Sequence, residues 1–250
     1  MESINQALKY LLSTAILDVF LLLIFIFFQI LNKDKVFKKP KLSFVGLTLI
    51  IGIATFFSLY PIQAITQVWF TEIGFNPTPF PYELNPTTFA ISLISFVLLP
   101  AVCEELMFRG LIQRKLSKYG QAFAIFVTSI FFSLFHFSIH QTIYPFLFAL
   151  LLGVIMSLTD NIVYCITLHA CNNLLALTLN YFNVSLYSLS LIYKIFGIIL
   201  AIAYLIFVIS VIIKQNKKSK KQKFTLPVII GTVLAFLILS GIWIYINFFM

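Results

Sequence analysis

The chain has 250 residues, of which 61% are hydrophobic and 10% are charged, and its mean hydropathy is +1.03. This composition excludes an ordinary soluble domain, because several stretches reach the ~20 apolar residues that a helix needs to cross a bilayer. The formal net charge is +9. The basic residues gather in short segments between apolar runs, which is typical of cytoplasmic loops and of contacts with lipid head groups, so we expect no nucleic-acid partner.

The apolar runs predict an all-α fold, a polytopic membrane helix bundle of about eight transmembrane helices that forms a single membrane domain over 1–250. The first run is too long for the core of a signal peptide and lacks a small-residue cleavage site, so we expect it to be retained as a span. The predicted spans are 8–31, 42–68, 88–108, 121–139, 143–159, 162–180, 189–213 and 226–249.

Lysine-rich loops indicate the topology. Five lysines lie in 33–41, six lie in the loop 214–223, and further basic residues lie in 109–118. Even numbers of crossings separate these loops, so all three can lie on the cytoplasmic side. We therefore expect a multi-pass protein of the cell membrane with both termini outside the cytoplasm and 214–223 as a basic cytoplasmic loop.

Two adjacent carboxylates, Glu104 and Glu105, end the third predicted span and are followed by Arg109. An ionisable side chain at the bilayer centre costs about 2.5–3.5 kcal/mol, so such residues are candidates for function. Residues four apart share a helix face, so we expect Glu105 to pair with Arg109. Glu104 lies about 140° from Arg109 around the axis and needs another partner. An unpaired carboxylate in an apolar site can act as a general base; the alternative is that these charges only end the span at the cytoplasmic interface.

Histidines mark two later spans. In the fourth predicted span Phe132 and His136 are four apart, and His140 continues the same helical face. Such a pair can bond between helices or ligate a metal. In the sixth span His169 and Asn173 are four apart, and they can donate two hydrogen bonds to an oxyanion, coordinate an ion or bond between helices.

The order of these motifs resembles the signature of the CPBP intramembrane protease family. That family groups type II CAAX prenyl endopeptidases with bacterial bacteriocin-processing and self-immunity proteins, often called Abi proteins. The matching motifs are Glu-Glu-x-x-x-Arg at 104–109, Phe-x-x-x-His at 132–136 and His-x-x-x-Asn at 169–173. The resemblance covers 85–180, which we expect to be the catalytic core.

The resemblance implies an intramembrane endopeptidase that hydrolyses peptide bonds. In this reading Glu104 activates the attacking water with help from His136, and His169 and Asn173 stabilise the oxyanion. The expected substrate is a hydrophobic or membrane-associated peptide, and membrane lipids are the other expected partners.

The supporting pair implied by the resemblance is Glu105 with Arg109, which would orient Glu104. Family members have been described both as metalloproteases and as metal-independent glutamate proteases. The preferred mechanism requires no cofactor. Zinc is the alternative, and Glu104, His136 and His169 would then hold it.

Two other functions stay open at this point. A non-proteolytic membrane regulator or bacteriocin self-immunity protein could use the same fold as an interaction scaffold. A transporter could use the carboxylates and histidines as a proton relay, although inverted repeats and paired broken helices do not stand out in the sequence. Asp18 in the first span and His140 receive no role.

Overall fold

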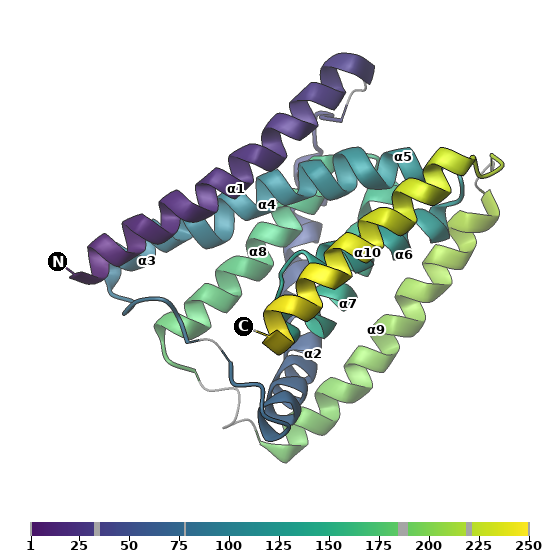
Figure 1. The fold of residues 1–250 in the computed structure, drawn as a ribbon. Helices are drawn as coiled ribbons and strands as arrows, with labels where there is room; N and C mark the ends of the chain where they lie inside the picture. The colour runs from purple at the N-terminus through teal and green to yellow at the C-terminus, as the bar shows by residue number, and fades with distance from the viewer. Residues whose placement is uncertain (1, 33–35, 78, 185–189, 219–221, 250) are drawn as a thin grey trace. The chain divides into compact units, whose positions relative to one another are not determined.

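The structure is a computed structural model that describes residues 2–32, 36–77, 79–184, 190–218 and 222–249, and this part of the chain contains helices and no β-strand (Figure 1). Seven helices in these residues are long and apolar enough to cross a membrane, and the shorter apolar helix α6 joins them. The prediction of an all-α polytopic bundle is confirmed. The elements are α1 (Glu2–Asn32), α2 (Leu42–Glu72), α3 (Pro86–Ser92), η1 (Leu93–Leu98), α4 (Leu99–Glu105), η2 (Leu106–Gln113), α5 (Arg114–Ser117), α6 (Gln121–Leu134), η3 (Ile139–Gln141), α7 (Ile143–Thr159), α8 (Ile162–Tyr181), α9 (Leu191–Lys218) and α10 (Leu226–Phe249).

The elements α3 to α5 form one continuous helix over Pro86–Ser117, which we call the central helix. Its start is specified locally, because the Asn85 side chain accepts hydrogen bonds from the backbone of Thr87 and Thr88 and Pro86 occupies the first turn. The segments η1 and η2 are π-helical, with a wider turn than an α-helix. Such segments are frequent at functional sites, and the Glu-Glu-x-x-x-Arg motif spans the junction of α4 and η2.

The chain divides into two compact units. Unit 1 comprises Met1–Phe57, Thr78–Leu111 and Thr159–Ser188, and unit 2 comprises Ser58–Pro77, Ile112–Leu158 and Leu189–Met250. In unit 1, α1 packs along α3, η1 and α4, and α8 packs on η1 and α4 (Figure 1). In unit 2, α6 packs on α5, α9 and α10.

Two close contacts define how α1 lies along the central helix. Near the start of α1, the Tyr10 ring stacks on Phe96, with ring centroids 4.7 Å apart. Near the end of α1, the Phe25 ring lies against Gly110, where a Cβ would be 3.1 Å from the ring. Because α1 meets earlier residues of the central helix first and later ones afterwards, the two helices run in the same direction.

The end of α6 differs from the predicted span 121–139. The helix stops at Leu134, and Phe137 adopts a positive φ of 51°, which a bulky side chain rarely does. The Ser133 hydroxyl donates to the Thr142 carbonyl across this turn at 2.6 Å, which ties its two sides together. His136 therefore lies in a turn and His140 in η3, so the predicted continuous helical face carrying both histidines is wrong.

Candidate active site

A hydrogen-bonded chain of three ionisable side chains lies inside unit 1. Arg109 Nη1 donates to Glu105 Oε1 at 2.8 Å, and His169 Nδ1 lies 2.9 Å from the same oxygen. Glu105 and Arg109 are 0% exposed and His169 is 3% exposed. The ion pair is the one expected from the four-residue spacing, whereas the bond from α8 to Glu105 was not anticipated from the sequence.

The partners of Glu105 define the orientation of the His169 ring. A carboxylate paired with a guanidinium accepts hydrogen bonds, so the proton between Glu105 and His169 belongs to Nδ1. Nε2 then lies on the opposite side of the ring. A neutral ring presents a lone pair at Nε2, and a protonated ring presents a second N–H donor there.

Glu104 is half-buried and lies outside this chain of hydrogen bonds. Its Oε2 atom is buried and makes no hydrogen bond to any described residue. The charged or titratable groups that interact with it electrostatically are Asp18, Glu105 and Arg109. Since Glu105 and Arg109 pair with each other, Glu104 has the unpaired carboxylate that the helix geometry predicts.

Asn173 lies one turn beyond His169 in α8 and is held against the central helix. Its Nδ2 donates to the Phe96 carbonyl in η1 at 2.9 Å, and its Oδ1 accepts from Asn172 Nδ2 at 3.3 Å. A carboxamide NH₂ has two N–H donors, so a second donor remains for another acceptor. Packing of α8 on α4 and η1 thus places Glu104, Glu105, Arg109, His169 and Asn173 on adjoining helices of one unit.

His136 belongs to unit 2, where it follows the last turn of α6. Its Nδ1 lies 2.8 Å from the Phe132 carbonyl oxygen, and a carbonyl can only accept, so Nδ1 carries the proton. In the neutral ring Nε2 is then a hydrogen-bond acceptor. The two motif residues Phe132 and His136 are therefore joined by a hydrogen bond from the His136 ring to the Phe132 carbonyl. Their rings are also in contact, with centroids 5.0 Å apart.

The side chains of the described residues contain no group of three or more His, Cys, Asp or Glu arranged to hold a metal ion. The predicted zinc ligands are Glu104 and His169 of unit 1 and His136 of unit 2. Zinc binding by these three residues stays a prediction, and no step of the chemistry below depends on it.

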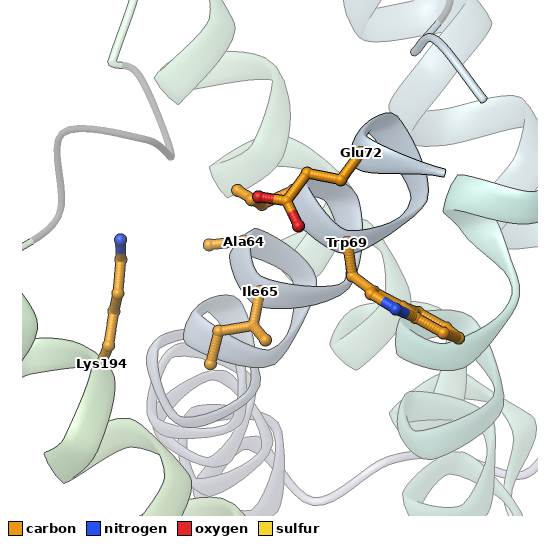
Figure 2. Close-up of a pocket in the computed structure, with 6 residues that line it drawn as sticks. Ala64, Ile65, Trp69, Glu72 and Lys194 are labelled. Atoms are coloured by element: carbon orange, nitrogen blue, oxygen red, sulfur yellow. The ribbon is translucent and has the colours of Figure 1, made fainter. Parts of the chain in front are cut away.

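A cavity of about 230 Å³ lies in unit 2 (Figure 2). The Glu72 carboxylate from the end of α2 and the Lys194 ammonium from the start of α9 face its space from different helices (Figure 2). None of the predicted site residues lines this cavity, so we assign no peptide chemistry to it. Its lining residues are Ala64, Ile65, Val68, Trp69, Glu72 and Lys194.

Comparison with known proteins identifies the segment that carries the motifs. Residues 86–175 match the family model described as Type II CAAX prenyl endopeptidase Rce1-like. This range contains all three motifs, from Glu104 to Asn173. No curated protein and no solved structure matches the chain.

The helical architecture is that of a multi-pass membrane protein, and its segment 86–175 is similar to CAAX-type intramembrane proteases. The model matched by this segment is one of the CPBP family, in agreement with the resemblance of the motifs.

Proposed function

We propose that the protein is an intramembrane endopeptidase that hydrolyses peptide bonds in a hydrophobic or membrane-associated peptide. The observation that carries this proposal is the buried chain Arg109–Glu105–His169 in the same helix pair as Glu104, whose Oε2 has no described hydrogen-bond partner. Charged groups buried this deeply in a membrane bundle are costly, and their usual explanation is function.

In the proposed reaction Glu104 is the general base. It removes a proton from a water molecule whose oxygen attacks the peptide carbonyl carbon, and His136 has the assisting role that the family resemblance implies. The peptide C–N bond then breaks, and the proton held by Glu104 passes to the leaving amine. This sequence balances atoms and charges without a further reactant.

The oxyanion is stabilised by donors from α8. His169 in its protonated form donates from Nε2, and Asn173 donates from the N–H that does not bind Phe96. The Glu105 carboxylate lies 2.9 Å from Nδ1 and so fixes the direction in which Nε2 points. In this proposal Glu105 and Arg109 therefore orient His169 directly, besides orienting Glu104.

The proposed mechanism requires no cofactor. If the enzyme is instead a metalloprotease, zinc held by Glu104, His136 and His169 would polarise the carbonyl and activate the water. Metal removal separates the alternatives: we expect protein stripped with a chelator, and shown to be metal-free by elemental analysis, to keep its cleavage rate. Loss of cleavage on stripping, with recovery on adding zinc, would contradict the metal-independent mechanism.

The proposal includes an orientation in the cell membrane. The predicted loop 109–118 is helical up to Ser117, so its basic residues 114–118 lie at the end of the central helix. These residues and the basic segments 33–41 and 214–223 would face the cytoplasm and both termini would face outward, which agrees with the charge distribution. Single cysteines at Lys38, Lys118, Lys223 and Glu2, in a background without the native cysteines, test this orientation by their accessibility to a membrane-impermeant thiol reagent. Labelling of the Lys38, Lys118 and Lys223 positions from outside intact cells would show that the orientation is the opposite one.

The central experiment measures peptide cleavage by protein reconstituted in lipid nanodiscs, with a library of amphipathic and hydrophobic peptides analysed by mass spectrometry. Glu104→Gln keeps the size of the side chain and removes the base, so we expect a loss of about 10²–10⁴-fold in rate. Glu83→Gln is the matched control, because Glu83 is an exposed carboxylate in the loop before the central helix.

Two results would overturn the endopeptidase. If the Glu104→Gln protein cleaves at the native rate, Glu104 is not the general base. If the native protein cleaves no peptide and its cellular phenotype survives Glu104→Gln and His136→Ala, the non-proteolytic regulator or self-immunity function is the correct one.

A further inference from the structure

The cavity of unit 2 lies beside a close contact between two helices, α2 and α9. A Cβ on Gly197 of α9 would lie 2.1 Å from the Pro61 ring of α2, and the lining of the cavity begins at Ala64, about one turn further along α2. Its volume of about 230 Å³ is below the roughly 300–1,000 Å³ of pockets that enclose a whole drug-sized ligand. The cavity therefore suits part of a larger molecule, such as a head group.

Two opposite charges face this cavity without pairing with each other. The Glu72 carboxylate comes from α2 and the Lys194 ammonium comes from α9 (Figure 2). Within the described part of the chain, neither side chain forms an ion pair or a hydrogen bond. A ligand that carries both a negative and a positive group can therefore satisfy both side chains at once.

The positions of these two charges are not explained by helix stability. Glu72 is the last residue of α2 and Lys194 is the fourth residue of α9. The helix dipole favours anions at the start of a helix and cations at its end, so each charge lies at the unfavourable end. Lys194 also lies at the opposite end of α9 from the lysine-rich segment 214–223, where basic residues are expected. A bound zwitterion compensates both charges where they stand.

We infer that this cavity binds the head group of a zwitterionic phospholipid with a primary ammonium, as in phosphatidylethanolamine. Lys194 binds the phosphate, and Glu72 accepts hydrogen bonds from the ammonium. Ile65 and Trp69 line the cavity and are also exposed, so the acyl chains can continue along an apolar helix surface, and tryptophan is typical of the membrane–water interface. The site lies outside the matched segment 86–175, and the inference does not depend on the proposed function.

The test measures lipid retention by native mass spectrometry of the purified protein. The protein is offered phosphatidylethanolamine and phosphatidylglycerol with the same acyl chains in equal amounts. Its net charge of +9 favours the anionic phosphatidylglycerol in general, so a preference for phosphatidylethanolamine indicates a specific site. We expect Glu72→Gln to lower the ratio of retained phosphatidylethanolamine to phosphatidylglycerol about three- to tenfold, and Lys194→Met to lower retention of both lipids.

Two variants at other exposed charges are the matched controls. Glu83→Gln removes a carboxylate from the loop before the central helix, and Lys9→Met removes an ammonium from α1. Both should retain the two lipids as the native protein does, because neither residue lines the cavity.

Fluorescence of Trp69 tests where the lipid binds. The chain has two tryptophans, so in a Trp243→Phe background the emission comes from Trp69. At the same low mole fraction in nanodiscs, phosphatidylethanolamine brominated near the head of its acyl chains should quench this emission more than brominated phosphatidylglycerol. Glu72→Gln should remove the difference.

Three results would overturn the inference. The first is equal retention of the two lipids by the native protein, and the second is a Glu72→Gln protein that retains them as Glu83→Gln does. The third is displacement of the lipid by an excess of soluble phosphoethanolamine, which would show that a soluble zwitterion is the ligand. Since peptide cleavage is not measured, failure of the proposed endopeptidase would leave these results unchanged.

Discussion

Helix α10 and the central helix are both long and apolar enough to cross a membrane, but they differ in their charged residues and in how deeply their residues are buried. α10 contains no Asp, Glu, Lys or Arg, and none of its residues is buried. The central helix carries Glu105 and Arg109 at 0% exposure, with α8 supplying His169 against them. Hydropathy alone makes a helix able to span, but a buried charge persists only where neighbouring helices provide its partner.

We expect the largest loss of stability when one member of the buried ion pair in the central helix is removed. Arg109→Met leaves Glu105 as a buried carboxylate without its guanidinium, and we expect it to lower the free energy of unfolding by about 3–5 kcal/mol. Unfolding in mixed detergent, followed by circular dichroism, measures the change.

The double variant Glu105→Leu with Arg109→Met is the control for that prediction. It replaces both charges by apolar groups of similar size, so much of the lost stability should return even though activity does not. A single Arg109→Met variant as stable as the native protein would show that the pair does not hold unit 1 together.

Replacing His169 tests whether the buried chain serves chemistry as well as packing. His169→Ala removes the donor from α8, so peptide cleavage should fall by about 10²–10³-fold in kcat. The matched control is His140→Ala, because the His140 ring bonds to the Phe75 carbonyl within unit 2 and has no assigned role. Equal effects of the two substitutions on kcat would refute a specific function for His169.

Two glycines of unit 2 differ in the space that surrounds them. A Cβ on Gly197 of α9 would lie 2.1 Å from the rigid ring of Pro61, whereas a Cβ on Gly241 of α10 would meet nothing within 4 Å. Overpacking of this kind costs about 1–3 kcal/mol, so Gly197→Ala should lower the unfolding midpoint in detergent. Gly241→Ala should leave it unchanged, and an equal loss for both would mean that the α9 contact is not tight.

The smallest effect is expected at the exposed ion pair of unit 1. Lys38 and Asp160 pair while their side chains are 48% and 57% exposed. Lys38→Met should change the free energy of unfolding by only ~0–1 kcal/mol, since solvent already stabilises both charges. A loss as large as that of Arg109→Met would contradict the view that burial distinguishes the two pairs.

Parts of the site could be predicted because they depend on neighbours along one helix. The Glu105–Arg109 pair follows from four-residue spacing, and the separate environment of Glu104 follows from its angle around the axis. The end of α6 could not be predicted in this way. Apolar residues continue past Leu134, and the turn is held by the bond between Ser133 and Thr142, which a hydropathy pattern does not reveal.

The amino-acid sequence by itself determined the membrane-spanning helices, the buried pair of the central helix and the family motifs, because each depends on composition or on residues a few positions apart. The tertiary structure decided that His169 reaches Glu105 and that Asn173 reaches the Phe96 carbonyl. Those contacts join residues far apart in the chain, and they arise only when the central helix and α8 pack in a particular register. Helix packing, rather than any local pattern, thus brings the histidine and the asparagine of α8 against the buried pair of the central helix.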